Sequence, residues 1–186
     1  MKSKGIIKQG SILISEPFLG DENFERTVIL VCEHNEEGTL GFVLNKPTAI
    51  TFDSVIVDIK SFNELLYLGG PVQQDSLHFI YRNKEYVEGS VKISNNLFWG
   101  GNYEQLLMLI NNKEIIAGDF RFFLGYSGWG EGQLEQEMEK NSWIIGDVAT
   151  AELFDTDPAD LWRVILKGMG GKYKMYSNYP IDPRLN

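Results

Sequence analysis

The fold depends most on residues 122–145, FFLGYSGWGEGQLEQEMEKNSWII. The first three residues of this segment are apolar and predict a buried strand. Glycines interleaved with Trp129 come next, and glycine tolerates backbone angles and close approaches that a Cβ forbids. We therefore expect a tight, ordered turn between Gly125 and Gly132, followed by a short acidic helix.

The acidic helix has one apolar face. At about 100° per residue, Leu134 and Met138 point the same way, whereas Glu135 points away from them. Glu137 lies at the edge of the apolar face, so we predict that its carboxylate is partly buried and accepts hydrogen bonds, with backbone N–H groups of the preceding turn as candidate donors. The outward carboxylates are interpreted as a solvated surface, with a site for a cation or a basic partner as the alternative.

Upstream of this stretch the sequence predicts mainly strands. A turn at residues 35–38 separates two apolar runs and favours an antiparallel hairpin, which Lys46-Pro47 ends because proline cannot donate to a ladder. Residues 51–66 fit a helix better than a strand, although both remain open. The expected strands are residues 10–15, 26–34, 39–45, 66–68 and 77–81, with a further pair within 86–94.

Helix signals are clearest in the second half of the chain. Asn102 is a suitable N-cap with Gln105 three residues later, and that helix should end near residue 112. Asp157 precedes Pro158 and predicts a last helix that ends before Gly168. Further expected elements are a strand at 143–148, one helical turn at 150–154 and a loop from residue 170 onward.

Strands joined by hairpin turns, with few helices between them, indicate an α+β fold rather than a doubly wound parallel sheet. The chain has 186 residues and no internal repeat or linker, so we expect one domain over residues 1–186.

The amino-acid composition limits the partners and the compartment that fit the chain. Seventeen Lys and Arg against 26 Asp and Glu give a formal charge of −9, which repels DNA and phospholipid headgroups on average. No apolar run is long enough for a membrane span or a signal-peptide core, so we expect a cytoplasmic protein without a membrane partner. The single cysteine, Cys32, agrees with a reducing compartment.

Several segments in order resemble the YqgE/AlgH family of bacterial proteins. The strongest is GYSGWGEGQLEQE followed by Trp143, and the others span nearly the whole chain. They are GSILISEPFLGDENFERTVILVCEH, GTLGFVLNKP, LYLGGPV, FWGGNYEQL and YPIDPRLN. The resemblance implies a bent, forked and mostly antiparallel sheet that forms a pseudo-barrel with helices packed outside. Some members carry the label of transcriptional regulator, which no motif in this chain explains.

Glycine-rich loops that converge leave space for a ligand. A binding groove is therefore predicted where residues 41–45, 69–72 and 125–133 meet. Its candidate residues are Asn45, Gly69, Gly70, Trp129, Gln133 and Glu137.

Other chemistry has little support in the sequence. Cys32 and His34 are two apart on one strand, the geometry of a thiolate–imidazole pair, but a third orienting residue is missing. No metal-ligand spacing occurs, and the glycine pairs lack the residues of a phosphate-binding loop, so we predict no metal and no cofactor.

A non-enzymatic protein that binds a protein or small ligand is the leading hypothesis. The alternative is a transcriptional regulator that contacts DNA, for which basic residues and tyrosines near the C-terminus could contribute by stacking and phosphate contact. A hydrolase that uses carboxylates is the third possibility. Duplex binding by the isolated protein is not expected at this net charge.

Overall fold

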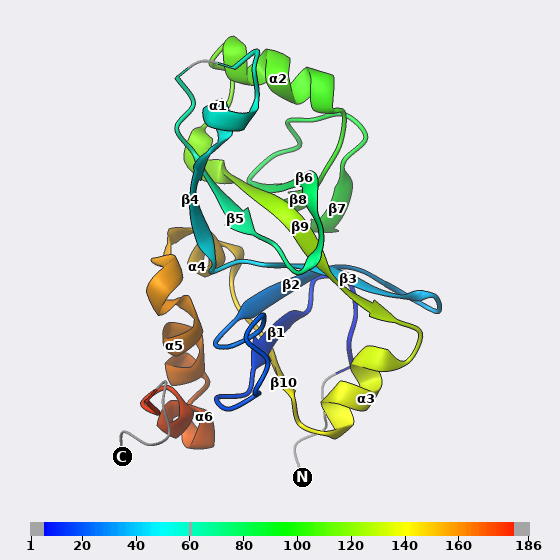
Figure 1. The fold of residues 1–186 in the computed structure, drawn as a ribbon, viewed down its shortest axis with the longest axis vertical. Helices are drawn as coiled ribbons and strands as arrows, with labels where there is room; N and C mark the ends of the chain where they lie inside the picture. Colours follow the sequence, from blue (N-terminus) through cyan, green and yellow to red (C-terminus); the bar gives the residue numbers. More distant parts are fainter. Residues whose placement is uncertain (1–5, 60, 181–186) are drawn as a thin grey trace.

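A computed structural model describes residues 6–59 and 61–180 and shows an α+β fold (Figure 1). Its strands form one open sheet that is antiparallel except at one pair, with strands β10 (Trp143–Gly146) and β7 (Val91–Ser94) at the two ends of the main pairing order. The α+β class and the bent, forked sheet expected for the family are confirmed. The sheet curls without closing into a barrel.

Strand β9 (Phe120–Gly130) is where the sheet forks. Its first half lies between β6 (Val72–Arg82), which is antiparallel to it, and β5 (Leu65–Leu68), which is parallel. Its last residues pair instead with β3 (Gly38–Val43). In Figure 1 the strand runs from the half of the molecule that holds α2 to the half that holds α3.

The expected turn between Gly125 and Gly132 is therefore wrong for most of its length, because β9 continues through Gly130. Gly125 adopts φ +67° where the register with β6 shifts, so it bends the strand without ending it. Gly125 and Gly70 let two backbones approach closely: a Cβ on Gly70 would lie 2.2 Å from the carbonyl of Tyr126. The chain turns only after Gly130, just before α3.

On one side of the fork the sheet order is β10, β1 (Ile12–Ser15), β2 (Val28–Asn35) and β3. The hairpin between β2 and β3 is confirmed, with Asn35 opposite Gly38. Strand β1 thus lies between its neighbour in sequence and a strand near the end of the chain.

On the other side, β6 pairs with β8 (Leu97–Trp99), and β8 pairs with β7. Strand β4 (Pro47–Thr51) pairs with β5 and is absent from the sequence prediction, in which Pro47 ends the hairpin. Proline is compatible with the first residue of an edge strand. The helix preferred for residues 51–66 is limited to α1 (Phe52–Val55).

The remaining helices flank the sheet. Both predicted caps are confirmed: Asn102 accepts from Gln105 N, and Asp157 accepts from Ala159 N. Two predictions were wrong: the last predicted helix continues through Gly168, and Gly171–Tyr176 is helical rather than a loop. Residues 181–186 of the predicted loop lie outside the described residues. The helices are α2 (Tyr103–Asn111), α3 (Gln133–Glu139), α4 (Thr150–Asp155), α5 (Pro158–Met169) and α6 (Gly171–Tyr176), with a 3-10 turn at Ala117–Asp119.

Three clusters of buried residues make up the core. One packs α5 against β1 and β2, a second packs α2 against β6 and β9, and a third packs α3 against β2 and β10. The third cluster includes Leu134 and Met138, so the apolar face predicted for the acidic helix is confirmed.

Candidate functional site

Glu137 is the centre of a compact polar cluster on α3. Its Oε2 atom accepts hydrogen bonds from the indole N–H of Trp129 at 2.9 Å and of Trp143 at 2.7 Å. Its Oε1 atom accepts one from the side-chain amide of Gln133 at 3.1 Å. The carboxylate therefore joins α3 to β9 and β10 through neutral donors.

Three of the six predicted site residues, Trp129, Gln133 and Glu137, meet in this cluster. Glu137 accepts hydrogen bonds as expected, but the donors are side chains and not backbone N–H groups of the turn. The sequence reasoning missed Trp143 as the second indole donor. The signal available was a second tryptophan six residues after Glu137, on the strand that follows the helix.

Asn45 makes two backbone contacts elsewhere. Its side-chain oxygen accepts from Val28 N at 2.9 Å, and its amide donates to Arg26 O at 2.8 Å. The side chain therefore ties the end of the β2–β3 hairpin to the start of β2.

Gly69 and Gly70 lie against the β9 backbone. Gly69 O accepts from Val43 N at 2.9 Å and from the Ser127 hydroxyl at 3.0 Å. These contacts hold three strands together at the fork. A binding role for the six residues stays a prediction.

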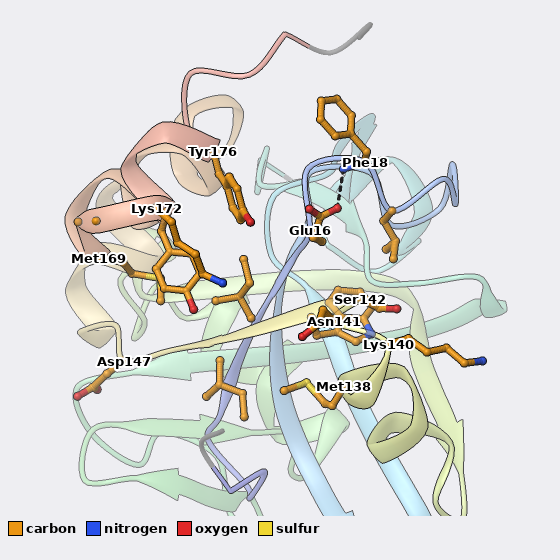
Figure 2. A pocket seen from close by; sticks show the side chains of 17 residues that line it. Glu16, Phe18, Met138, Lys140, Asn141, Ser142, Asp147, Met169, Lys172 and Tyr176 are labelled. Atoms are coloured by element: carbon orange, nitrogen blue, oxygen red, sulfur yellow. Dashed lines mark hydrogen bonds between the residues drawn. The ribbon is translucent and has the colours of Figure 1, made fainter. Parts of the chain in front are cut away.

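A cavity of about 1240 Å³ lies beside β10. Strand β10 forms its floor, the end of α3 one wall, and α6 with the end of α5 the other; the loop after β1 contributes Glu16, Phe18 and Leu19 (Figure 2). None of the six predicted residues lines it. Its lining residues from the floor and the two walls are Met138, Lys140, Asn141, Ser142, Trp143, Ile144, Ile145, Asp147, Met169, Gly170, Gly171, Lys172, Tyr173 and Tyr176. We call it the β10 groove.

Charges of both signs line the β10 groove. Lys140 and Asp147 are exposed at opposite ends of β10. Glu16 is engaged by Phe18 N at 3.0 Å, and the Lys172 ammonium lies 5.2 Å from the ring centre of Tyr173. The groove thus combines aromatic and aliphatic side chains with a substantial share of charged and polar ones.

A smaller cavity of about 360 Å³ lies at the other end of the sheet. His78 lines it together with Trp99 and Tyr103. Burial lowers the pKa of His78, and its Nε2 atom lies 3.0 Å from the Ser76 hydroxyl. The site is an aromatic recess with a neutral imidazole.

Cys32 and His34 have separate environments. The Cys32 side chain is fully buried, and burial raises its thiol pKa well above the ordinary value. His34 Nδ1 lies 2.7 Å from the Thr39 hydroxyl, and its Nε2 lies 3.8 Å from Glu135. Within the described part of the chain, no hydrogen bond joins the thiol to the imidazole.

Arg121 is a buried cation that the sequence reasoning overlooked. Its guanidinium donates to Leu44 O and Leu153 O, both at 3.0 Å, and to Phe154 O at 3.4 Å. It also lies 4.8 Å from the ring centre of Tyr67. Burial lowers its pKa from the ordinary value. The signal was a single charge inside the apolar run of residues 120–124.

Residues 6–59 and 61–180 contain neither a metal-binding cluster nor a membrane-spanning helix. No group of three or more His, Cys, Asp or Glu residues there could hold a metal ion. No helix in the same ranges is long and apolar enough to cross a membrane.

Comparison with known families matches residues 12–174 to the family described as AlgH-like. The chain belongs to the AlgH-like family. The UPF0301 protein of Cytophaga hutchinsonii is 52% identical over 97% of this chain and 100% of its own length. The UPF0301 protein of Chlorobium limicola is 43% identical over 97% of this chain and 96% of its own. The family resemblance of the sequence is confirmed.

The AlgH-like fold is also seen in solved structures. The crystal structure of a Corynebacterium diphtheriae protein has a TM-score of 0.77 at 24% identity, covers 95% of each chain, and shows the fold alone. The solution structure of the AlgH protein from Pseudomonas aeruginosa has a TM-score of 0.70 at 25% identity and covers 97% of this chain and 98% of its own.

Proposed function

We propose that this protein is a non-enzymatic binding module, and that the β10 groove holds its protein or small-molecule ligand. The observation that carries this proposal is the groove itself. Its volume of about 1240 Å³ is enough to hold a ligand, because ligand clefts usually measure about 300–1,000 Å³. Apolar and aromatic side chains line it together with a substantial share of charged and polar ones.

Electrostatics support a ligand other than duplex DNA. A DNA-binding surface presents a continuous set of Lys and Arg to the phosphates. The groove instead contains both basic residues, Lys140 and Lys172, and acidic residues, Glu16 and Asp147. The whole chain has a formal charge of −9. The cytoplasm stays our proposed compartment, because Cys32 is a buried thiol that needs no oxidising environment.

A blocking substitution tests the assignment. Ser142 lines the groove, so Ser142→Trp places a bulky side chain inside it. Ser94→Trp is the matched control, because Ser94 is exposed on β7, at the opposite end of the sheet. Both variants should keep the far-ultraviolet circular dichroism of the unmodified protein.

The three proteins are then used to capture ligands from a bacterial lysate, with native mass spectrometry for small molecules and peptide sequencing for proteins. We expect a ligand retained by the unmodified protein and by Ser94→Trp but lost from Ser142→Trp. Identical retention by all three would place binding elsewhere. Retention of sequence-specific duplex DNA would favour the regulator alternative.

A further inference from the structure

We infer that the β10 groove takes an extended segment of a partner protein, which adds to the sheet as a strand antiparallel to β10. This inference rests on the proposed function and specifies the chemical class of the ligand. Its basis is an open row of backbone hydrogen-bonding groups along the groove floor.

The hydrogen bonds of β1 show which of its residues face β10. Glu16 N donates to Ser142 O at 3.0 Å, so Glu16 faces the β10 side. Ser15 N donates to Thr27 O at 3.0 Å, so Ser15 faces β2. Backbone direction alternates along a strand, and in an antiparallel pair bonded and non-bonded residue pairs alternate in the same way.

This alternation fixes the direction of the β10 backbone. Trp143 stands opposite Ser15. Ile145 stands opposite Leu13, which faces β2 like Ser15. Both are non-bonded positions, so Trp143 and Ile145 direct their N–H and C=O groups away from β1 and into the groove. No hydrogen bond of these four groups occurs among residues 6–59 and 61–180.

The residues of β10 do not block pairing. Edge strands are usually protected by short length, charge, proline, a bulge, or a covering helix or loop. Strand β7 carries the exposed Lys92 and a register shift beside it, and β4 begins with Pro47. Strand β10 is also short, but it reads Trp-Ile-Ile-Gly, without charge or proline, and has a continuous register with β1. Its edge is recessed between the α3 and α6 walls of the groove.

The two groove walls define where side chains of an added strand would go. Trp143 packs in the cluster with α3, whereas Ile144 packs against the cluster with α5. An added strand would direct alternate side chains to the same two sides. One side meets Met138 and the other meets Tyr173 and Tyr176 (Figure 2). Apolar or aromatic residues are therefore favoured at successive positions of the peptide.

The antiparallel orientation matches the pairing of β10 with β1 and is slightly more stable per residue than a parallel one. Charge complementarity then sets the charges expected in the peptide. Lys140 precedes β10 and Asp147 follows it, and both are exposed. An antiparallel segment starts beside Asp147 and ends beside Lys140. It is best matched by a basic residue at its beginning and an acidic residue or a terminal carboxylate at its end. A parallel segment needs the opposite order of charges.

A second copy of this chain fits the edge less well than a single strand does. Its β10 lies between the same two walls, formed by α3 and by α6. Pairing the β10 edges of two copies would bring the α3 and α6 walls of one copy against those of the other. An isolated strand enters between the two walls of one copy. Association of two copies through β10 is accordingly an outcome that would overturn the inference.

The first test uses ten-residue peptides displayed on phage and selected against the immobilised full-length protein. Enriched peptides should carry runs of apolar residues with a basic residue before them and an acidic residue after them. N-methylation of alternate peptide residues then identifies backbone bonding. Methylation in one alternate set should weaken binding by about tenfold or more for each lost hydrogen bond, and methylation in the other set by less than about twofold.

The second test works on the protein. Ile145→Pro removes an outward N–H without removing a bond to β1, and edge strands tolerate such a proline. Peptide affinity should fall by about tenfold or more, whereas the control Ile145→Val should stay within about threefold. Amide exchange on the unmodified protein gives the same information if the proline variant misfolds: the N–H groups of Trp143 and Ile145 should become protected only when peptide is added.

Several results would overturn the inference. They are no enriched peptide, equal effects of methylation in both sets, and no new protection of Trp143 and Ile145. A dimer in sedimentation that protects these N–H groups without peptide would assign the edge to a second copy. A small molecule lost from Ser142→Trp, with no peptide enriched, would leave the proposed function standing and reject only the strand-addition inference.

Discussion

Arg121 and Glu137 are both charged side chains held by neutral groups, but the two regions use different groups. Arg121 donates to three backbone carbonyls, one just after β3 and two in α4. Glu137 accepts from three side chains, and two of them are tryptophans on β9 and β10. The first cluster depends on the path of the chain, and the second on the identity of nearby residues.

This difference determines which substitutions disrupt the hydrogen bonds of each cluster. The carbonyls around Arg121 belong to backbone that no substitution removes, so only a change of Arg121 itself ends all three bonds. The Glu137 cluster can be opened from either side, because each donor is a side chain. The comparison therefore predicts a graded set of stability effects.

The largest effect is expected for Arg121→Ala, which strands three carbonyls and leaves a void under α4. We expect the free energy of unfolding to fall by about 3 to 4 kcal/mol, and α4 to lose its attachment first. Urea unfolding followed by tryptophan fluorescence measures this. A loss of unfolding free energy smaller than that of Glu137→Ala would contradict the predicted order of the two clusters.

Glu137→Ala is expected to cost about 1 to 3 kcal/mol, because two indole N–H groups lose their acceptor. The urea midpoint is the measurement. Unchanged or higher stability would show that the carboxylate is held at a cost, as residues of binding sites often are.

A double-mutant cycle between Glu137→Ala and Trp143→Phe separates the indole bond from packing. We expect a coupling energy of about 1 kcal/mol. Trp162→Phe is the matched control, because the Trp162 indole donates to Ser15 O and not to Glu137. Its effect should add to that of Glu137→Ala within about 0.5 kcal/mol. Equal coupling energies for both tryptophans would show that the coupling does not arise from the Glu137–Trp143 hydrogen bond.

The smallest effect is expected for Glu135→Ala. Glu135 lies on the exposed face of the same helix, and its only described ion pair is a 3.8 Å contact with His34. The change in unfolding free energy should stay within about 0.5 kcal/mol. A larger loss would mean that the outer face of α3 has a structural role.

The same contrast explains what the sequence could predict. Glu137 was recognised because its position on a short helix depends on periodicity within a few residues. Both helix caps were likewise local signals. Arg121 was not recognised, because its acceptors lie 77, 32 and 33 residues away and are backbone atoms without a residue signature.

The β10 groove was not predicted from the sequence, for a related reason. At the converging glycines the strands approach closely, as the contact of Gly70 with the Tyr126 backbone shows. The open edge of β10 follows from its place in the sheet order, and that order depends on β1 pairing with a strand about 130 positions later in the chain. Local patterns contain no information on such pairing.

The position of β9 at the fork has a consequence for synthesis. Strands β3, β5 and β6 each keep one edge unpaired until β9, whose last residue is Gly130, has been synthesised. The roughly 87 residues from the end of β3 at Val43 to Gly130 take roughly 4 to 17 s to synthesise at about 5 to 20 residues per second. During this interval the nascent chain exposes unpaired strand edges, so the protein is most vulnerable to aggregation before β9 emerges, and protection by a chaperone would be most useful then.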